Sequence, residues 1–196
     1  MSLLVYFMLF FGTAWGQAIR DSTKVTNNLW GVGTSITYPL AEIYMIQVSY
    51  SPWEFGDILF GAAYQNWEND QGRSHAYTFL LGYRQFVWGG IHTEIELWPA
   101  YNPFHSSVDG KTYAGFELWM SIRIGYKFDF KLASNDLFVL AQPGIGFGVA
   151  RENPWPDKGK NDKVIFEPQL IVGIRLWIVY APKQNSAHFN RRFVQA

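Results

Sequence analysis

Three residues of types that together can transfer an acyl group occur close to one another near the middle of the chain. His105 and Ser107 are two positions apart, and Glu117 follows at the start of the next apolar segment. A serine activated by a histidine, which a carboxylate orients in turn, is the arrangement that nucleophilic acyl transfer needs. The same stretch contains Asp109-Gly110, a turn signal. A turn-rich loop without catalytic activity therefore explains these residues as well, and it is the interpretation we favour.

A second group with possible chemistry is His92, Glu94 and Glu96, which occupy alternate positions of one segment. Alternate residues of a strand share one face, so the three side chains could gather a metal ion. One imidazole and two carboxylates form a thin ligand set, and Arg and Lys residues of the facing segments can neutralise the carboxylates without a metal. We therefore expect no metal site and no cofactor.

Composition narrows the classes of protein to which the chain can belong. With 196 residues it forms one domain, and its 16 basic and 16 acidic residues leave a net charge of zero. This balance offers no electrostatic footprint for nucleic acid, which we exclude as a partner. The absence of cysteine excludes disulfides and thiolate metal sites. Charged residues make up only 16% and aromatic residues 18% of the chain, so an apolar environment must accommodate many rings.

The N-terminus has the residue pattern of an export signal. Residues 3–11 form an unbroken apolar run, and small residues follow at Gly16 and Ala18, where a signal peptidase requires them. The alternative, a transmembrane anchor, needs about 20 apolar residues, more than this run contains. We therefore predict a signal peptide at residues 1–18, cleaved after Ala18.

Past residue 24, apolar and polar residues alternate with a period of two, which is typical of strands whose faces meet different environments. The clearest segment, 116–128, places its apolar residues on one face and Glu117, Arg123 and Lys127 on the other. Pro143 and Pro168 fall inside such segments and predict bulges or strand ends there. About eight segments alternate in this way: 30–38, 44–50, 58–64, 77–84, 91–98, 116–128, 139–149 and 166–178.

The connections between these segments alternate in length. Long polar stretches at 66–75, 102–112 and 151–163 follow the third, fifth and seventh segments, whereas the intervening connections are shorter. The short link 39–41 departs from this pattern. Long loops gathered at one end are typical of transmembrane barrels. The sequence therefore predicts an all-β, antiparallel up-and-down transmembrane β-barrel of about eight strands over residues 19–180, with no substantial helix beyond the signal peptide.

Alternation alone does not tell which face is buried, since a soluble lipocalin-like ligand-binding barrel also alternates. The apolar faces of several segments carry no charge and are bracketed by aromatic residues, as a lipid-facing surface requires. The predicted lipid-facing girdle consists of Trp30, Tyr38, Tyr44, Tyr50, Tyr77, Tyr83, Phe166 and Tyr180. The soluble barrel remains an alternative.

The opposite faces combine glycine with charges of both signs. A barrel of eight strands is only wide enough to be filled by side chains. We therefore predict a polar network that fills the lumen, and we keep a selective polar pore as the alternative. The predicted network consists of Arg84, His92, Glu94, Glu96, Glu117, Arg123, Lys127, Glu167 and Arg175.

In architecture, residues 25–180 resemble the small bacterial outer-membrane barrels of the OmpA and OmpX type. Residues 166–177 look like the closing strand that the barrel assembly machinery recognises in that family. The resemblance implies a location in the outer membrane of a Gram-negative bacterium, with outer-membrane lipids and that machinery as partners. Family members usually end on an aromatic residue at this strand, whereas this chain continues through a polar tail, residues 181–196.

The His105-x-Ser107 pair with the later Glu117 also resembles outer-membrane lipid A deacylases. That resemblance implies a hydrolase in which His105 activates Ser107. In those enzymes an asparagine follows the serine, whereas Val108 and Asp109 follow it here. We therefore expect a non-enzymatic outer-membrane barrel with a structural or surface-interaction role, and the deacylase-like hydrolase is the alternative. The sequence names no extracellular ligand.

Overall fold

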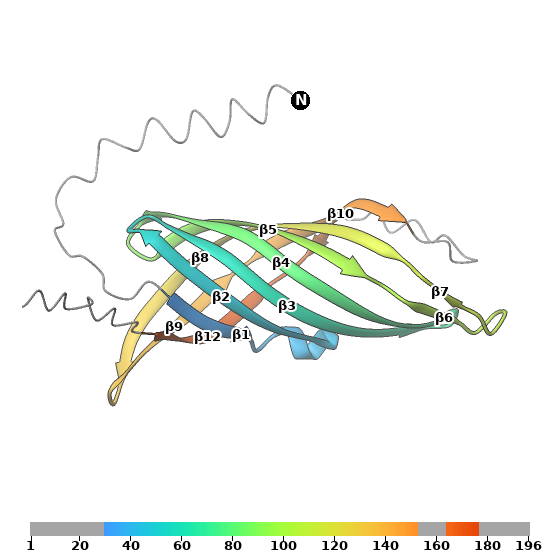
Figure 1. Cartoon of the computed structure of the whole chain (residues 1–196). Helices are drawn as coiled ribbons and strands as arrows, with labels where there is room; N and C mark the ends of the chain where they lie inside the picture. The colour runs from blue at the N-terminus through green and yellow to red at the C-terminus, as the bar shows by residue number, and fades with distance from the viewer. Residues whose placement is uncertain (1–29, 153–163, 177–196) are drawn as a thin grey trace, which may run out of the picture.

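The computed structural model describes residues 30–152 and 164–176, and these form one closed antiparallel barrel (Figure 1). The first four strands are β1 (Trp30–Ser35), β2 (Ile43–Trp53), β3 (Gly56–Asn69) and β4 (Gly72–Trp88). Each pairs with the strand that follows it. The predicted signal peptide, the predicted tail and Tyr180 lie outside the described residues.

Each of the remaining four strands is interrupted once without losing its register. The segments are β5 (Ile91–Tyr101) with β6 (Phe104–Ser106), β7 (Thr112–Tyr113) with β8 (Phe116–Leu132), β9 (Asn135–Gln142) with β10 (Gly144–Glu152), and β11 (Ile165–Phe166) with β12 (Gln169–Leu176). Because β1 pairs with β12 as well as with β2, the sheet closes. The predicted all-β fold of eight antiparallel strands is confirmed.

The register also determines how steeply the strands tilt. A row of paired residues that starts at Trp30 passes through each strand in turn and reaches Phe166 on β11. On the other side of β1, Ser35 pairs with Ile171, and the same register places position 40 opposite Phe166. The row therefore returns to the first strand ten residues beyond Trp30, where it began. This stagger corresponds to a strand tilt of about 40° in an eight-stranded barrel.

The interruptions at Pro143 and Pro168 lie where the sequence predicts bulges or strand ends. β9 ends at Gln142 and β10 begins at Gly144, while β11 and β12 are separated by Glu167 and Pro168. Proline has no N–H group with which to continue a ladder. Each strand is therefore interrupted at its proline.

Two of the predicted long loops are instead extensions of the sheet. β3 and β4 pair as far as Asn69 and Gly72, so only two residues of the predicted loop 66–75 remain unpaired. The loop 102–112 contains β6 and the first residue of β7, and these two strands pair with each other. Cross-strand contacts stabilise these polar segments, for example the Arg73–Glu68 ion pair at 2.7 Å. The third predicted loop, 151–163, lies mostly outside the described residues.

Tyr38 is a correction to the predicted girdle. The ladder between β1 and β12 stops at Ser35, and the chain then turns into a short 3₁₀ helix, η1 (Tyr38–Ala41), that contains Pro39. This turn carries Tyr38 into the barrel, where only 8% of it is exposed.

Among the described residues, no helix is long and apolar enough to cross a membrane.

Apolar side chains fill part of the interior. One cluster lies inside the barrel next to η1 and includes Tyr38, Met45, Leu59, Leu80 and Trp98. A smaller one combines Phe138, Leu140 and Ile171 beneath β9 and β12. The Phe138 ring lies directly over the inner face of Gly173, so any side chain at that position would collide with it.

Candidate functional site in the barrel lumen

The centre of the lumen holds charged side chains that the register places in a row. Arg84 on β4 is paired with Glu94 on β5, which is paired with Arg123 on β8. Inward positions of neighbouring strands lie side by side, so opposite charges at paired positions meet directly. Arg84 Nη2 lies 2.6 Å and Arg123 Nη1 3.5 Å from the Glu94 carboxylate. The three side chains are almost fully buried.

Arg123 is the residue with the most charged partners in this row. Its guanidinium contacts Glu96 as well as Glu94, lies 3.2 Å from the Glu167 carboxylate and donates a 2.8 Å hydrogen bond to the Tyr38 hydroxyl. A planar guanidinium with several donors can bridge carboxylates in this way, which a lysine cannot do equally well. Arg123 therefore links β5, β8, the β11–β12 segment and η1.

The carboxylates of Glu96 and Glu167 have further neutral donors. Glu96 accepts hydrogen bonds from Gln47 Nε2 at 2.7 Å and from the Trp98 indole at 3.0 Å. Glu167 accepts from Trp119 at 2.9 Å and from Ser121 at 2.7 Å. A carboxylate removed from water is tolerated when donors occupy its oxygens. These contacts hold both carboxylates in place at the side of the lumen nearer the long hairpins.

Toward the opposite end, Asp57 joins Arg84 to Lys127. Asp57 Oδ2 lies 3.0 Å from Arg84 Nη1 and 3.7 Å from Lys127 Nζ. The Lys127 ammonium also lies 5.1 Å from the centre of the Phe138 ring, within range of a cation–π contact. The sequence analysis missed Asp57 because the third segment was taken to begin at Ile58. Extending the alternation back by one residue places it inward.

His92 takes part in a network of side-chain amides. Its Nε2 lies 2.9 Å from Gln142 Oε1, and its Nδ1 lies 3.1 Å from the carbonyl oxygen of Gly90. Gln142 Nε2 in turn donates to Glu94 at 2.9 Å and to Gln169. Within residues 30–152 and 164–176, no group of three or more His, Asp or Glu side chains is arranged to hold a metal ion.

Two ion pairs lie at the ends of the lumen. Glu117 contacts Arg151 and accepts a 3.0 Å hydrogen bond from Asn102 near the long hairpins. Arg175 binds Asp129 through two oxygens at 2.8 Å near the short turns. These pairs are more exposed than the central group, and they complete the set of charges that the sequence placed inside.

The structure does not bring the three possible catalytic residues together. His105 is exposed on the outward side of β6, and its Nδ1 lies 3.2 Å from the hydroxyl of Thr112. The backbone N–H of Ser107 donates to the carbonyl oxygen of Gln71 at 2.7 Å. Glu117 faces the lumen. A histidine and a carboxylate on opposite faces of one sheet cannot orient each other, so this group does not form a catalytic triad.

The hairpin that carries His105 has its own stabilising contact. The Tyr113 hydroxyl donates a hydrogen bond to the Asp109 carboxylate. This bond lowers the pKa of Asp109 below its usual range and raises the pKa of Tyr113. The folded-state pKa of Asp109 is therefore depressed, so the contact persists above that pKa and is lost as the pH falls through it.

The outward face carries the aromatic residues. On the side of the long hairpins, one row of paired positions is aromatic in five consecutive strands: Tyr44, Tyr64, Tyr77, Tyr101 and Phe116. Near the opposite end, the rings of Trp30 and Tyr50 lie 4.6 Å apart. We call these two groups the two aromatic levels of the outer face. Tyr83 and the exposed Phe166 also lie at outward positions. Tyr64, Tyr101 and Phe116 were not among the predicted girdle residues.

Comparisons with known proteins identify no family for the chain. No protein-family model matches the sequence, and no curated protein matches it. Among solved structures, it is similar to the N-terminal β-barrel domain of OprF from Pseudomonas aeruginosa, with a TM-score of 0.45 and 12% sequence identity. The match covers 76% of this chain and 98% of that domain.

Proposed function

We propose that this protein is an integral outer-membrane barrel without enzymatic activity, which has a structural or surface-interaction role. The observation that carries the proposal is the reversed distribution of polarity across the barrel wall. Ile124 is 63% and Phe79 is 50% exposed on the outside, whereas Arg84 and Arg123 inside are each 1% exposed. A soluble barrel of the lipocalin type would place its charges outside and its apolar residues inside.

The apolar surface has the height that a bilayer requires. The outward positions of β5 between Ile91 and Tyr101 carry no charged residue. Ten residues at a rise of about 3.3 Å each and a tilt of about 40° span about 25 Å, the height of the apolar band of outer-membrane barrels. The outward positions of the other strands are also free of charge between the two aromatic levels. In water, an apolar surface of this extent would drive aggregation.

The side chains of the lumen also support a closed interior. The row Arg84–Glu94–Arg123 crosses three neighbouring strands, and Glu167 and Gln142 continue it toward the remaining wall. An ion that passed this level would have to displace partnered charges. We therefore propose that the lumen does not conduct. Large steady currents through the purified protein in planar bilayers would overturn this part of the proposal.

Fractionation and gel electrophoresis test the membrane assignment. We expect the protein in the outer-membrane fraction, and we expect the folded barrel, kept in detergent without boiling, to change its mobility on boiling. We expect the fold to resist denaturation by detergent because each strand has two paired neighbours. Solubility without detergent, together with an unchanged mobility, would contradict the proposal.

The hydrolase alternative receives no support from the positions of His105, Ser107 and Glu117. Mass spectrometry of lipid A from cells with and without the protein tests this point. We expect the same acyl pattern in both. Loss of an acyl chain only in cells that contain the protein would restore the hydrolase.

A further inference from the structure

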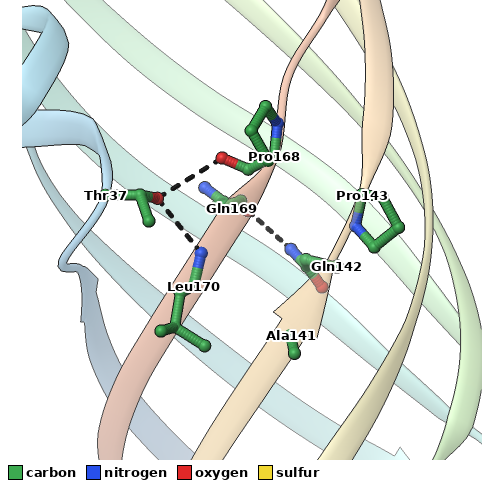
Figure 2. A pocket seen from close by; sticks show the side chains of 7 residues that line it. All are labelled: Thr37, Ala141, Gln142, Pro143, Pro168, Gln169 and Leu170. Carbon is green, nitrogen blue, oxygen red and sulfur yellow. Dashed lines mark hydrogen bonds between the residues drawn. The ribbon is translucent and has the colours of Figure 1, made fainter.

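The barrel wall has a hollow between β9, β12 and the residues that follow β1 (Figure 2). A cavity of about 220 Å³ lies there. Its lining combines outward apolar positions with two amides that point inward: Ala141, Pro143, Pro168, Leu170, Gln142 and Gln169, with Thr37 at the edge. The hollow is thus an apolar depression of the outer surface, with the two buried amides beneath it.

Two prolines account for the hollow. The register on both sides of the break places Pro143 opposite Pro168. Ile124 donates a hydrogen bond of 3.1 Å to the carbonyl oxygen of Pro143, but Pro143 has no N–H group with which to return one. Pro168 likewise has no N–H group that could donate a hydrogen bond to the residues that follow β1. The ladder is therefore weakened on both flanks of this proline pair.

The hydroxyl of Thr37 replaces backbone pairing at the edge of the hollow. Its Oγ1 accepts a 3.1 Å hydrogen bond from the N–H of Leu170 and donates to the carbonyl oxygen of Pro168 at 3.4 Å (Figure 2). A side chain that bridges two segments holds them farther apart than a direct ladder does. The wall remains connected here but leaves room between its segments.

We propose that this hollow is a lateral site that binds one acyl chain of a membrane lipid. The proposal rests on the membrane location proposed above. The hollow opens on the charge-free face between the two aromatic levels, where acyl chains are the surrounding medium. An enclosed apolar cavity of about 150 Å³ binds a benzene molecule, and this hollow, although open to the outside, has room for a short hydrocarbon segment.

The floor of the site distinguishes it from the rest of the lipid-facing surface. Gln142 and Gln169 are each buried, and the amide of Gln169 donates to the thioether of Met45, a weak acceptor, at 3.4 Å. A chain that enters the hollow therefore meets an amide layer that stops it before the charged row. The site binds hydrocarbon without opening the lumen.

Crosslinking in vesicles tests the site. The purified full chain is inserted into phosphatidylcholine vesicles that contain a lipid with a photoreactive diazirine in its acyl chain, and the modified residues are mapped by mass spectrometry. We expect the segments 141–143 and 168–170 to be modified at least about fivefold more than the outward positions around Ala62 on β3. Even modification of all outward faces would overturn the site.

A matched pair of variants identifies the cavity as the cause. Ala141→Leu fills the hollow, and Ala62→Leu makes the same change at an outward alanine on the other side of the barrel. We expect Ala141→Leu to abolish the enrichment and Ala62→Leu to preserve it. Enrichment that survives in Ala141→Leu would contradict the proposal. If Ala141→Leu does not fold, as judged by gel mobility, the comparison between segments 141–143 and 168–170 and the positions around Ala62 in the unchanged protein still tests the site.

Absence of crosslinks anywhere in the protein would instead show that the chain is not embedded, and would refute the membrane proposal as well.

Discussion

The two sides of the barrel wall are built differently. β3 and β4 pair without a break over fourteen positions, and β5 pairs with β8 over eleven. By contrast, β1 pairs with β12 over six positions, and prolines interrupt the strands formed by β9–β10 and β11–β12. The long, regular side supplies Arg84, Glu94, Glu96 and Arg123, whereas the interrupted side supplies mainly amides and apolar residues to the lumen. Buried charges are thus held by the part of the wall whose geometry is most regular.

This difference has a physical reason. A buried ion pair is tolerated only with good geometry and satisfied donors, and breaking it by removing one partner is costly. A neutral amide loses less when its neighbours shift. The regular side, which includes β3, β4, β5 and β8, can position charges accurately. The interrupted side, which includes β9, β10, β11 and β12, can shift without leaving a buried charge unpaired. The predictions below test this contrast.

The largest effect is expected from Arg123→Met. This change leaves Glu94, Glu96 and Glu167 without their shared cation, so we expect the free energy of unfolding to fall by about 3–5 kcal/mol. Urea titration of the barrel in lipid vesicles measures it. Arg73→Met, which removes an arginine from the exposed pair with Glu68, is the control and should cost less than about 1 kcal/mol. Equal losses in the two variants would show that the lumen charges have no special role.

A charge on the outer face should have the next largest effect. Ile124 and Leu132 lie on the outward face of β8 and are each 63% exposed, but Ile124 lies between the aromatic levels and Leu132 near the turn. We expect Ile124→Arg to destabilise the protein by about 2–4 kcal/mol in a bilayer and Leu132→Arg by about 0–1 kcal/mol. The same titration compares the two. If Leu132→Arg cost as much as Ile124→Arg, depth in the membrane would not be the cause.

The amide side should be affected less by a comparable deletion. Gln142→Leu removes the donor to Glu94 and the partner of His92, and we expect a loss of about 1–3 kcal/mol. The expected order is therefore Arg123→Met above Gln142→Leu under identical conditions. A reversed order would overturn the contrast between the two sides of the wall.

Hydrogen exchange should reveal the contrast without any substitution. Amides that pair β3 with β4 should exchange slowest, while those near Pro143 and Pro168 should exchange at least about tenfold faster, because fewer intact hydrogen bonds hold them closed. Mass spectrometry of the barrel in detergent micelles or vesicles measures both segments together. Uniform protection around the barrel would show that the prolines do not weaken the wall.

The sequence was sufficient for the fold because a period of two is a local property. The alternation over 116–128 determines which β8 residues face the lumen, and the structure places Arg123 and Lys127 inside as expected. The exact partners could not be predicted, because they depend on register between strands. The link between Arg123 and Tyr38 joins residues 85 positions apart. Tyr38 was wrongly predicted to face lipid, because the strand ends at Ser35 and Tyr38 begins the 3₁₀ helix that contains Pro39.

The hairpins were misjudged for a related reason. The polar residues of 66–75 are typical of a loop in sequence. In the structure they belong to β3 and β4, which continue to pair beyond the row of aromatic residues at Tyr64 and Tyr77. There, Glu68 and Arg73 face each other as an exposed ion pair, which the proposed membrane location places in water beyond the lipid. Polarity indicated the surroundings of this segment, but it did not indicate the backbone conformation.

The central claim is that the alternating faces of each strand meet lipid outside and a closed polar network inside. Because the chain contains no cysteine, single cysteines can be placed along β4 at Tyr77, Thr78, Phe79, Leu80 and Leu81 and labelled with a small fluorophore. In vesicles whose acyl chains carry bromine, we expect strong quenching at positions 77, 79 and 81 and little at 78 and 80. Equal quenching at all five positions, or quenching confined to 78 and 80, would contradict the account.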